Sequence, residues 1–436
     1  MSVTVFLSAL GCPKNRVDSE KTLWALEEAG ARITLDQTEA DLLLVNTCGF
    51  VTGAKEESIE KTLELAEVKK LNPGARLAVM GCLSERYRDE LKKRIPEIDH
   101  IYGVHELERL VQELAGGPPH EKPMDPEQMT HRTLTTPPGW AYLKIAEGCS
   151  NTCSFCAIPM IRGPYRSRDA ETIFQEAQGL AQRGVKELNV VAQDTTLYGA
   201  DLKLKNGLAG LVQRLAGLEQ IEWIRLMYLY PPLLDNHLLE TMAGNKKAAP
   251  YFDIPFQHAS DKILKMMNRK ETGGSIRELV ARVRRTVPGA AIRSAFIIGF
   301  PGETEEDFEL LLSFIKEARL DHVGAFVYSP EENTGAVKLK GRPAARVARE
   351  RLERLMAAQR EISMEILAAQ VGSEQSVLVE GFDPDESLLT GRTARQAPEV
   401  DGCVILDGVE AAPGQMVRVK ITGALDYDLV GSPLAP

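Results

Sequence analysis

Three cysteines in the middle of the chain have the spacing of a metal site. Cys149, Cys153 and Cys156 lie in the segment GCSNTCSFC, at the spacing C-x3-C-x2-C. Three thiolates this close together can bind three irons of a [4Fe-4S] cubane, whereas a structural zinc site needs a fourth ligand, and no Cys or His follows at zinc-finger spacing. The alternative, three neighbouring core cysteines, accounts for neither the residue type nor the offsets. The spacing therefore predicts a cluster with one open iron, where a bound molecule can receive an electron.

A second group of three cysteines lies in the N-terminal part of the chain. Cys12, Cys48 and Cys82 each follow an apolar, strand-like segment, about one strand-helix repeat apart. A single Cys at the end of a strand is usually a small core residue. In a parallel sheet, however, the carboxyl ends of the strands share one edge, so these three thiols are expected to converge. We therefore predict a second metal site at that edge. The seventh cysteine, Cys403, is predicted to be a core residue.

The elements that must position the second group alternate between strand and helix. Strands are predicted where apolar residues run together, and helices where they recur with helical spacing. In chain order, these elements are 3–10, 19–29, 42–46, 56–69 and 77–80. We predict an α/β domain over 1–116. The next segment, 117–139, is rich in Pro, Gly and charge and lacks periodicity, which indicates a linker.

Six further strands must position the central cysteines. They are predicted at 142–146, 187–192, 222–228, 251–256, 291–298 and 322–328, with helices between them such as 171–182, 261–267 and 305–318. Parallel strands joined by helices can curl into a barrel, and six units rather than eight leave it open on one side. The cluster motif directly follows the first strand, at the face where such folds hold their chemistry. We predict an open (βα)6 barrel over 140–370, ending in a long helix, 343–369, that leads away from it.

The last part of the chain, 371–436, changes in composition. Short β-type runs broken by Gly, Pro and Asp are typical of a small antiparallel barrel. They are 375–380, 388–392, 403–406, 415–422 and 429–430. This region has 11 Asp and Glu against four Lys and Arg, so it carries most of the chain's net charge of −10. Such a surface repels a phosphate backbone and attracts a basic partner; the alternative is an ordinary solvated acidic face.

The composition excludes several classes of protein. A net charge of −10 argues against a chain that coats nucleic acid through a broad basic surface. The 44% apolar content of 436 residues is enough for several hydrophobic cores. The first apolar run has no basic segment before it, and no run is long enough to span a membrane. Because the cysteines group in threes rather than in disulfide pairs, we expect a cytoplasmic protein. Because no dimerisation heptads are visible, we expect a monomer. We expect no membrane partner.

Across nearly the whole chain, the sequence resembles the radical S-adenosylmethionine (SAM) methylthiotransferases. The segments that carry the resemblance are AYLKIAEGCSNTCSFCAIPMIRGPYRSR, QDTTLYG, RLMYLYP and YFDIPFQHASDKILKMMNR, at 141–168, 193–199, 225–231 and 251–269. The resemblance implies a flavodoxin-like N-terminal domain with an auxiliary [4Fe-4S] cluster on its three cysteines. It also implies that Cys149, Cys153 and Cys156 hold the catalytic cluster that binds SAM. The C-terminal barrel is then a TRAM domain, which docks the substrate.

The sequence is more similar to the branch that modifies a ribosomal protein than to the branch that modifies tRNA. The resemblance implies transfer of a methylthio group to the β-carbon of an aspartate in ribosomal protein S-twelve. One SAM would methylate a sulfide on the auxiliary cluster, and a second would give the 5'-deoxyadenosyl radical that removes a β-hydrogen. A reductase and a sulfur donor are implied as partners. The alternatives are a tRNA adenosine methylthiotransferase and a non-catalytic two-cluster electron carrier.

Other candidate contacts for SAM or the substrate lie close to predicted strand ends. Phe155 fits the aromatic residue that the superfamily has before its third cysteine. Gln193 and Asp194 end the second core strand at the face of the cluster motif. Tyr228 and His258 also lie near strand ends, although a lone Tyr or His is more often part of the structure than of the chemistry.

A glycine-rich turn is predicted after the fifth core strand. The segment IIGFPGE resembles a SAM-contacting motif of the superfamily, which makes Gly299, Gly302 and Glu303 candidate contacts. Glycines let the backbone approach a ligand closely. The alternative is a plain strand-to-helix turn with a Pro and an acidic helix start.

Overall fold

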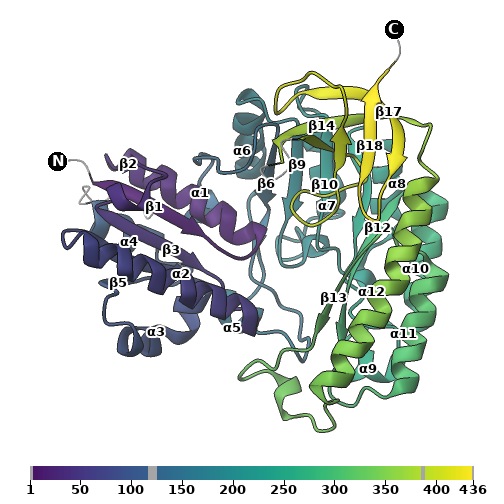
Figure 1. The fold of residues 1–436 in the computed structure, drawn as a ribbon, viewed down its shortest axis with the longest axis horizontal. Helices are drawn as coiled ribbons and strands as arrows, with labels where there is room; N and C mark the ends of the chain where they lie inside the picture. Colours follow the sequence, from purple (N-terminus) through teal and green to yellow (C-terminus); the bar gives the residue numbers. More distant parts are fainter. Residues whose placement is uncertain (1–2, 116–124, 384–387, 435–436) are drawn as a thin grey trace.

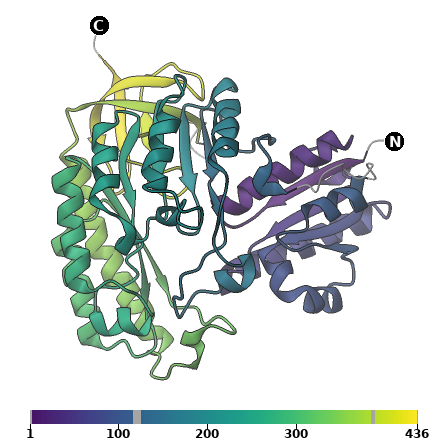
Figure 2. The same ribbon diagram turned by 180° about the vertical axis from the view of Figure 1, so that it is seen from behind.

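The computed structural model describes residues 3–115, 125–383 and 388–434. Three sheets organise these residues: five strands near the N-terminus, six in the middle, and a closed five-stranded barrel near the C-terminus. In Figure 1 the N-terminal unit, purple and blue, lies beside the central unit, and the yellow barrel sits at one end of the central sheet. Figure 2 shows the same arrangement from behind. The three predicted folds are therefore confirmed.

The N-terminal sheet is parallel throughout, with the order β2-β1-β3-β4-β5. Its strands are β1 (Thr4–Ala9), β2 (Arg32–Ile33), β3 (Leu42–Thr47), β4 (Arg76–Gly81) and β5 (His100–Ile101). This is the strand order of flavodoxin-like folds, as predicted. The strands β2 and β5 were not predicted, because two residues are too short to show an alternation of apolar and polar side chains.

Helices cover both faces of this sheet. α1 (Pro13–Glu28) and α4 (Leu107–Ala115) pack on one face, and α2 (Thr52–Leu71) and α3 (Cys82–Arg94) pack on the other.

Helix α1 begins well before the predicted start at residue 19. Its first turns are polar, yet Lys14, Asn15, Glu20 and Lys21 are buried. The helix also packs on β6 (Trp140–Lys144), the first strand of the central sheet. An apolar stripe cannot reveal a helix whose second face is buried by polar contacts, so the predicted start was wrong.

The central sheet is also parallel throughout, with the order β13-β12-β11-β10-β9-β6. After β6 its strands are β9 (Glu187–Val191), β10 (Trp223–Leu226), β11 (Ala248–Asp253), β12 (Ala291–Ile298) and β13 (His322–Val327). The six strands follow chain order and β6 and β13 form the two edges, which confirms the open (βα)6 barrel. A small hairpin of β7 (Ala146–Glu147) and β8 (Arg166–Ser167) flanks the cysteine loop.

Helices pack on the outside of the central sheet and bury the main hydrophobic core. They are α6 (Ala170–Gln182), α7 (Gly207–Ala216), α8 (Asn236–Gly244), α10 (Gly273–Thr286) and α11 (Glu305–Ala318). The short helices α5 (Ile158–Arg162) and α9 (Asp261–Met266) belong to two separate small clusters, the first with Cys82 and the second with Met267. Capping side chains fix several starts; Thr304, for example, accepts from the Asp307 amide in a capping box at α11.

The long helix α12 (Ala345–Ala368) does not lead away from the barrel, contrary to the prediction. It packs along α11 and β13, as Figure 1 shows. Leu355 and Ile362 of this helix belong to the main core, and Arg351 and Gln359 are buried beside them. Polar residues share the buried face of this helix, so its sequence shows no clean apolar stripe. For this reason the prediction that the helix leads away from the barrel was wrong.

The C-terminal barrel closes in the order β14-β15-β16-β18-β17. Its strands are β14 (Glu374–Phe382), β15 (Leu389–Thr393), β16 (Val404–Leu406), β17 (Met416–Ala424) and β18 (Leu429–Pro433). Within the described residues the pairs are antiparallel except β16 with β18, which run parallel and close the barrel. Cys403 lies just before β16, half-buried, and its amide donates to Asp428.

The predicted linker lies partly outside the described residues, over 117–124. Its described part, 125–139, packs against both α/β units: buried Arg132 pairs with Glu20 of α1 at 3.0 Å and Glu176 of α6 at 3.1 Å. The predicted domain boundaries stay a prediction. Within the part of the chain that the structure describes, no helix combines the length and apolar composition needed to cross a bilayer.

Candidate functional site

The N-terminal triad (Cys12, Cys48 and Cys82) lies at the carboxyl edge of the first sheet. Cys12 caps the start of α1, Cys48 follows β3, and Cys82 is the first residue of α3 after β4. The three preceding strands are neighbours in the parallel sheet. A Cβ built on Gly11 would lie 3.1 Å from the Cys48 sulfur, so the Cys12 loop passes directly over the second cysteine. The fold thus brings the three thiols together.

Asn15 and Arg162 surround this triad with polar atoms. The Asn15 side-chain amide donates to the carbonyls of Leu10 and Thr47, both at 3.0 Å, and so ties two strand ends together. Its oxygen lies 3.6 Å from the Cys82 sulfur and also accepts from Arg162. The Arg162 guanidinium lies 3.4 Å from the same sulfur, although it comes from α5, just after the central cysteine loop.

Burial disfavours the ionised form of these thiols. It raises the pKa of Cys48 to about 12, and the neighbouring Cys12 and Cys82 act in the same direction. Burial also raises the pKa of Cys82, although Arg162 acts against it. Iron binds the thiolate, so the buried sulfurs of Cys48 and Cys82 need a positive charge beside them before they ionise. The irons of a cluster supply that charge, and the donor set therefore fits an iron–sulfur cluster.

The central triad (Cys149, Cys153 and Cys156) lies on a loop after β7. Gly148 has φ +76°, and a Cβ there would lie 2.2 Å from the Pro164 carbonyl oxygen, so only glycine fits before the first cysteine. The Cys149 amide donates to the Gly163 carbonyl at 3.1 Å. Ser154, inside the loop, donates to the carbonyls that end α9. Backbone contacts thus fix the loop from two sides.

Two residues contact the sulfurs of the central triad. The Arg269 side chain lies 3.7 Å from the Cys153 sulfur and stacks on the Tyr230 ring. The Asn151 backbone N–H donates to the Cys149 sulfur at 3.4 Å, and the Asn151 side chain donates to Asp194 at 2.7 Å. Burial raises the pKa of Cys156 to about 12, as it does for Cys48. The donor set of the central triad therefore also fits an iron–sulfur cluster.

Neither triad has the dimensions of a single-ion site. One zinc ion would hold three sulfurs about 3.8 Å apart, because the zinc–sulfur bond is about 2.3 Å long and the angles are tetrahedral. Among the described residues, the one group of Cys, His, Asp or Glu with ligand atoms all within 4.8 Å of one another contains no cysteine. A cubane binds each thiolate at a different iron and fits the wider spacing.

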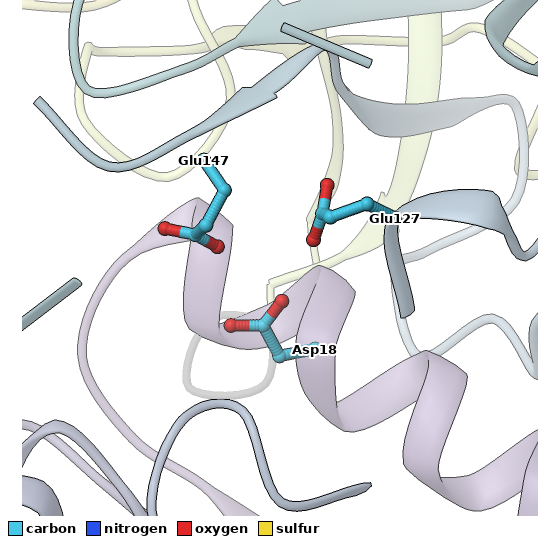
Figure 3. A group of neighbouring side chains, drawn as sticks. All are labelled: Asp18, Glu127 and Glu147. Atoms are coloured by element: carbon cyan, nitrogen blue, oxygen red, sulfur yellow. The ribbon is translucent and has the colours of Figure 1, made fainter. Parts of the chain in front are cut away.

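That remaining group is acidic and consists of Asp18, Glu127 and Glu147, whose carboxylates face one another in Figure 3. The Lys144 ammonium lies 2.6 Å from Asp18, 2.6 Å from Glu127 and 2.9 Å from Glu147. Arg162 pairs with Asp18 and Glu147 as well. Burial would raise the pKa of Asp18, but Lys144 and Arg162 hold it below its usual value. Side-chain cations neutralise this group, which joins α1 to the central unit.

Three predicted SAM or substrate contacts lie around the central triad. Asp194 is buried, which raises the pKa of its carboxyl, and it contacts Asn151. Gln193 donates to Glu147 at 2.9 Å, and its own side-chain oxygen is buried without a partner among the described residues. Phe155 packs against an apolar cluster that contains Met267. Their roles stay predictions.

The glycine-rich turn after β12 packs inward. Gly299 has φ +73°, its amide donates to Glu303 at 2.8 Å, and a Cβ there would lie 2.7 Å from the Ala348 Cβ in α12. A Cβ on Gly302 would lie 2.7 Å from Met266. The buried Glu303 carboxylate pairs with Arg351 at 2.7 Å. These contacts fit a plain structural turn, and the SAM contacts predicted for these residues stay predictions.

Tyr228 lies close to the N-terminal triad. It has φ +60°, an unusual conformation for a residue with a side chain, and its amide donates to Asp253 at 3.0 Å. The Lys14 ammonium lies 3.5 Å from the centre of its ring. Burial raises the pKa of Tyr228, and Cys12 contributes in the same direction. His258 is buried, with Glu303 at 3.5 Å from its ring nitrogen, and so belongs to the turn.

Sequence reasoning missed four polar residues that contact the triads or their immediate neighbours: Lys14, Asn15, Arg162 and Arg269. Lys14 and Asn15 lie two and three residues after Cys12, and Arg162 lies six residues after Cys156. Polar residues within one helical turn of a ligand cysteine, at a helix start, were the available signal. Arg269 is distant from any cysteine in the sequence, and only the fold brings it to Cys153.

Sequence models of known families match all three units. Residues 4–103 match the uncharacterized protein family UPF0004, residues 143–315 match the radical SAM superfamily, and residues 371–434 match the TRAM domain.

Two solved structures share the fold with low sequence identity. The radical SAM methyltransferase TsrM from Kitasatospora setae is 15% identical, with a TM-score of 0.54 over 89% of this chain and 80% of that chain. The cobalamin-dependent radical enzyme OxsB is 14% identical, with a TM-score of 0.52 over 82% of this chain and 56% of that chain. These likenesses support the fold alone.

Curated relatives are similar over nearly their whole length. The ribosomal protein uS12 methylthiotransferase RimO of Solibacter usitatus is 45% identical over 98% of this chain and 94% of its own. The proteins of the same name from Geobacter sulfurreducens and Pelotomaculum thermopropionicum are 43% and 46% identical, and the alignments cover at least 98% of each chain. The chain therefore belongs to the RimO family of radical SAM methylthiotransferases.

Proposed function

We propose that this chain transfers a methylthio group to the β-carbon of an aspartate in ribosomal protein uS12. The observation that carries the proposal is the 43–46% identity, over at least 98% of this chain, to relatives named for methylthio transfer to that protein. Two separate cysteine triads match the need for two clusters. Because these relatives are named for a ribosomal protein, the tRNA alternative is not favoured.

SAM and [4Fe-4S] clusters are the cofactors of the radical SAM superfamily. In this proposal the N-terminal triad holds the auxiliary cluster and the central triad holds the cluster that binds SAM. When bound, these groups supply the radical that removes a hydrogen atom and the methylthio group that replaces it. The protein holds the thiolates, places polar groups such as Arg162 and Arg269 beside the sulfurs, and positions the substrate between the two loops.

Side chains at the central triad are proposed to contact SAM or the substrate. Gln193 has a free oxygen within the described residues, and Asp194 is linked through Asn151 to Cys149. Phe155 shapes the loop by packing below it. Gly299, Gly302 and Glu303 are proposed to act by holding the turn and α12 in place rather than by contacting SAM.

The C-terminal barrel is proposed to dock the substrate, but only part of its acidity is available for that. Asp401 pairs with Arg293 of the central sheet at 2.6 Å, and Glu399 pairs with Arg16 of α1 at 2.7 Å. These carboxylates therefore hold the barrel on the other two units. Among the described residues of the barrel, the other exposed acidic side chains are Asp407, Glu410, Asp426 and Glu374, of which the last two pair with Arg360 and Arg418. They form the surface that would attract a basic protein.

The proposal also includes the partners and the setting. A reductase supplies electrons and a sulfur donor replaces the sulfur that each turnover consumes. The cysteine triads need a reducing compartment, which supports a cytoplasmic location. We propose that the protein acts as a monomer.

The proposed function is tested by offering two substrates at once. The reconstituted, reduced protein is incubated without oxygen with SAM, sulfide, purified uS12 and unmodified tRNA, and both substrates are read by mass spectrometry. We expect a methylthio increment on the aspartate-bearing peptide of uS12 alone. Cys149→Ala is the control, since it removes a ligand of the central cluster and is expected to stop SAM cleavage.

An increment on tRNA alone would overturn the proposed substrate. Cleavage of SAM with no change in either substrate would overturn both methylthiotransferase assignments.

A further inference from the structure

The proposed substrate brings a negative charge to the site, and this inference rests on that proposed function. An aspartate side chain has a pKa of about 3.9 and is ionised near neutral pH. Its carboxylate is bonded to the carbon that reacts, so it must lie in the space between the two cysteine triads. A carboxylate taken out of water there needs a hydrogen-bonding cation.

The other cations around the two triads already have carboxylate partners. Arg162 and Lys144 share the acidic group of Figure 3. Arg269 pairs with Glu271, and Arg293 pairs with Asp401. A substrate carboxylate would have to compete for any of these cations.

Lys14 is different. It is 8% exposed, and its ammonium makes no hydrogen bond or ion pair with any residue that the structure describes. Its ammonium lies on the face of the Tyr228 ring, at 3.5 Å from the ring centre, and the charges of Cys12 and Asp253 act on it without an ion pair. Because the nitrogen has no such partner and still does not count as a fully buried atom, it keeps some exposure to solvent. A cation–π contact alone offsets only part of the cost of burying an ammonium group.

Lys14 lies between the two triads. It is two residues after Cys12, at the start of α1, where the positive end of the helix also favours an anion. Its contact Tyr228 lies at the end of β10, and the Tyr228 carbonyl accepts from the Thr195 amide at 3.0 Å. The residue before Thr195 is Asp194, which contacts Asn151 beside the Cys149 sulfur. A continuous series of contacts thus runs from Cys12 to Cys149 through Lys14 and Tyr228.

Tyr228 is held in an uncommon conformation at this point. Its φ of +60° is unfavourable for a residue with a side chain. Asp253 accepts from its amide, Thr195 donates to its carbonyl, and the Lys14 ammonium lies on its ring. These contacts hold the aromatic ring against the ammonium and so fix where the Lys14 charge lies.

We propose that Lys14 is the residue that binds the side-chain carboxylate of the substrate aspartate, with Tyr228 as the platform that positions its ammonium group. The interaction is a charge-assisted hydrogen bond between the ammonium and a carboxylate oxygen. It distinguishes aspartate from asparagine and fixes the β-carbon between the two cluster sites. Tyr228 acts through Lys14 and is a positioning residue.

The experiment measures binding separately from chemistry. Labelled uS12 and its variant with asparagine at the modified aspartate are titrated with the reconstituted protein in the absence of SAM, and fluorescence anisotropy gives the two dissociation constants. We expect the wild-type protein to bind the aspartate form about tenfold more tightly, the scale of one charge-assisted hydrogen bond. Lys14→Met should reduce that ratio to about one, and Lys14→Arg should restore part of it.

Lys92→Met is the matched control, because it makes the same substitution at an exposed lysine of the N-terminal unit and should keep the wild-type ratio. Iron content and SAM cleavage of Lys14→Met are measured in parallel and should stay at wild-type levels. The inference is overturned if the wild-type protein binds both forms equally, if Lys14→Met keeps the wild-type ratio, or if that variant loses SAM cleavage instead, which would assign Lys14 a role at the SAM site. If wild-type protein never modifies uS12, the proposed function fails, whatever the binding ratio.

Discussion

At the scale of single residues, Arg162 connects the two cysteine loops. Its guanidinium follows the central triad in the chain but contacts the Cys82 sulfur at 3.4 Å and donates to the carboxylates of Asp18 and Glu147 at 2.8 and 2.9 Å. A hydrogen bond to a ligand sulfur stabilises the ionised thiolate and tunes a cluster. Arg162 therefore places a positive charge at the N-terminal triad from a helix that directly follows the loop of the central triad.

We expect Arg162→Met to weaken the auxiliary cluster. Loss of the contact to Cys82 should lower iron affinity at the N-terminal triad by about 10- to 100-fold, the usual effect of removing such a partner. The measurement is iron and sulfide content after reconstitution, with electron paramagnetic resonance of the reduced protein, where roughly half of the iron should be lost. Arg166→Met removes an exposed arginine from the same region and should keep full iron. Equal iron in the two variants would contradict the assigned role.

At the scale of elements, the turn after β12 and the helix α12 determine each other's position. Gly299 brings the backbone so close to α12 that a Cβ would lie 2.7 Å from the Ala348 Cβ, and Arg351 of the same helix binds Glu303 at the end of the turn. A helix that packs here cannot lead away from the barrel. The turn thus has a structural reason for its glycine that does not depend on SAM.

Gly299→Ala is expected to destabilise the protein by about 2–4 kcal/mol, because the residue keeps an unfavourable positive φ and the new Cβ clashes with the Ala348 Cβ of α12. The free energy of unfolding is measured by denaturant titration. Gly210→Ala, inside α7 with nothing near its Cβ, is the control and should stabilise by about 0.5–1 kcal/mol. The second substitution Ala348→Gly should rescue part of the loss. No loss for Gly299→Ala would show that the turn tolerates a side chain.

At the scale of the whole molecule, a buried ion triad joins the C-terminal barrel to the central sheet. Glu187 at the start of β9 pairs with Arg225 of β10 and Arg392 of β15, both at 2.7 Å. Burial would raise the pKa of Glu187, but Arg392 and Arg225 hold it below its ordinary value of 4.5. Its ionised form therefore stabilises the docked barrel above about pH 4.5.

This stabilisation should be lost as the pH falls below about 4.5, through the lower pKa of the folded protein, because protonation then leaves two buried guanidinium groups unpaired. Glu187→Gln should cost about 3 kcal/mol at neutral pH and remove that part of the pH dependence. Limited proteolysis and denaturant titration from pH 7 to 3 measure both effects. Glu380→Gln, which removes a partly exposed partner of Arg392, should cost less than about 1 kcal/mol. If both variants lose the same free energy of unfolding, the buried ion triad does not stabilise the protein more than a partly exposed ion pair does.

The sequence by itself determined the cofactor chemistry and the architecture. Thiols at C-x3-C-x2-C spacing, and three strands that each end in a cysteine, are local patterns, and parallel sheets place strand ends at one edge whatever the side chains are. The six core strands were predicted because buried parallel strands are apolar along their whole length. These features depend on residue type and spacing, which are visible in one dimension.

Only the tertiary structure decided which polar residues complete the site. Lys14, Asn15 and Arg162 look like an ordinary polar helix start and an ordinary loop arginine, and their burial results from the packing of α1 against the central unit. In the same way, Asp401 and Glu399 counted as an acidic surface until the fold paired them with Arg293 and Arg16. The physical reason is that a charge has no pattern that reveals its partner: the partner is set by contacts between units that are distant in the chain.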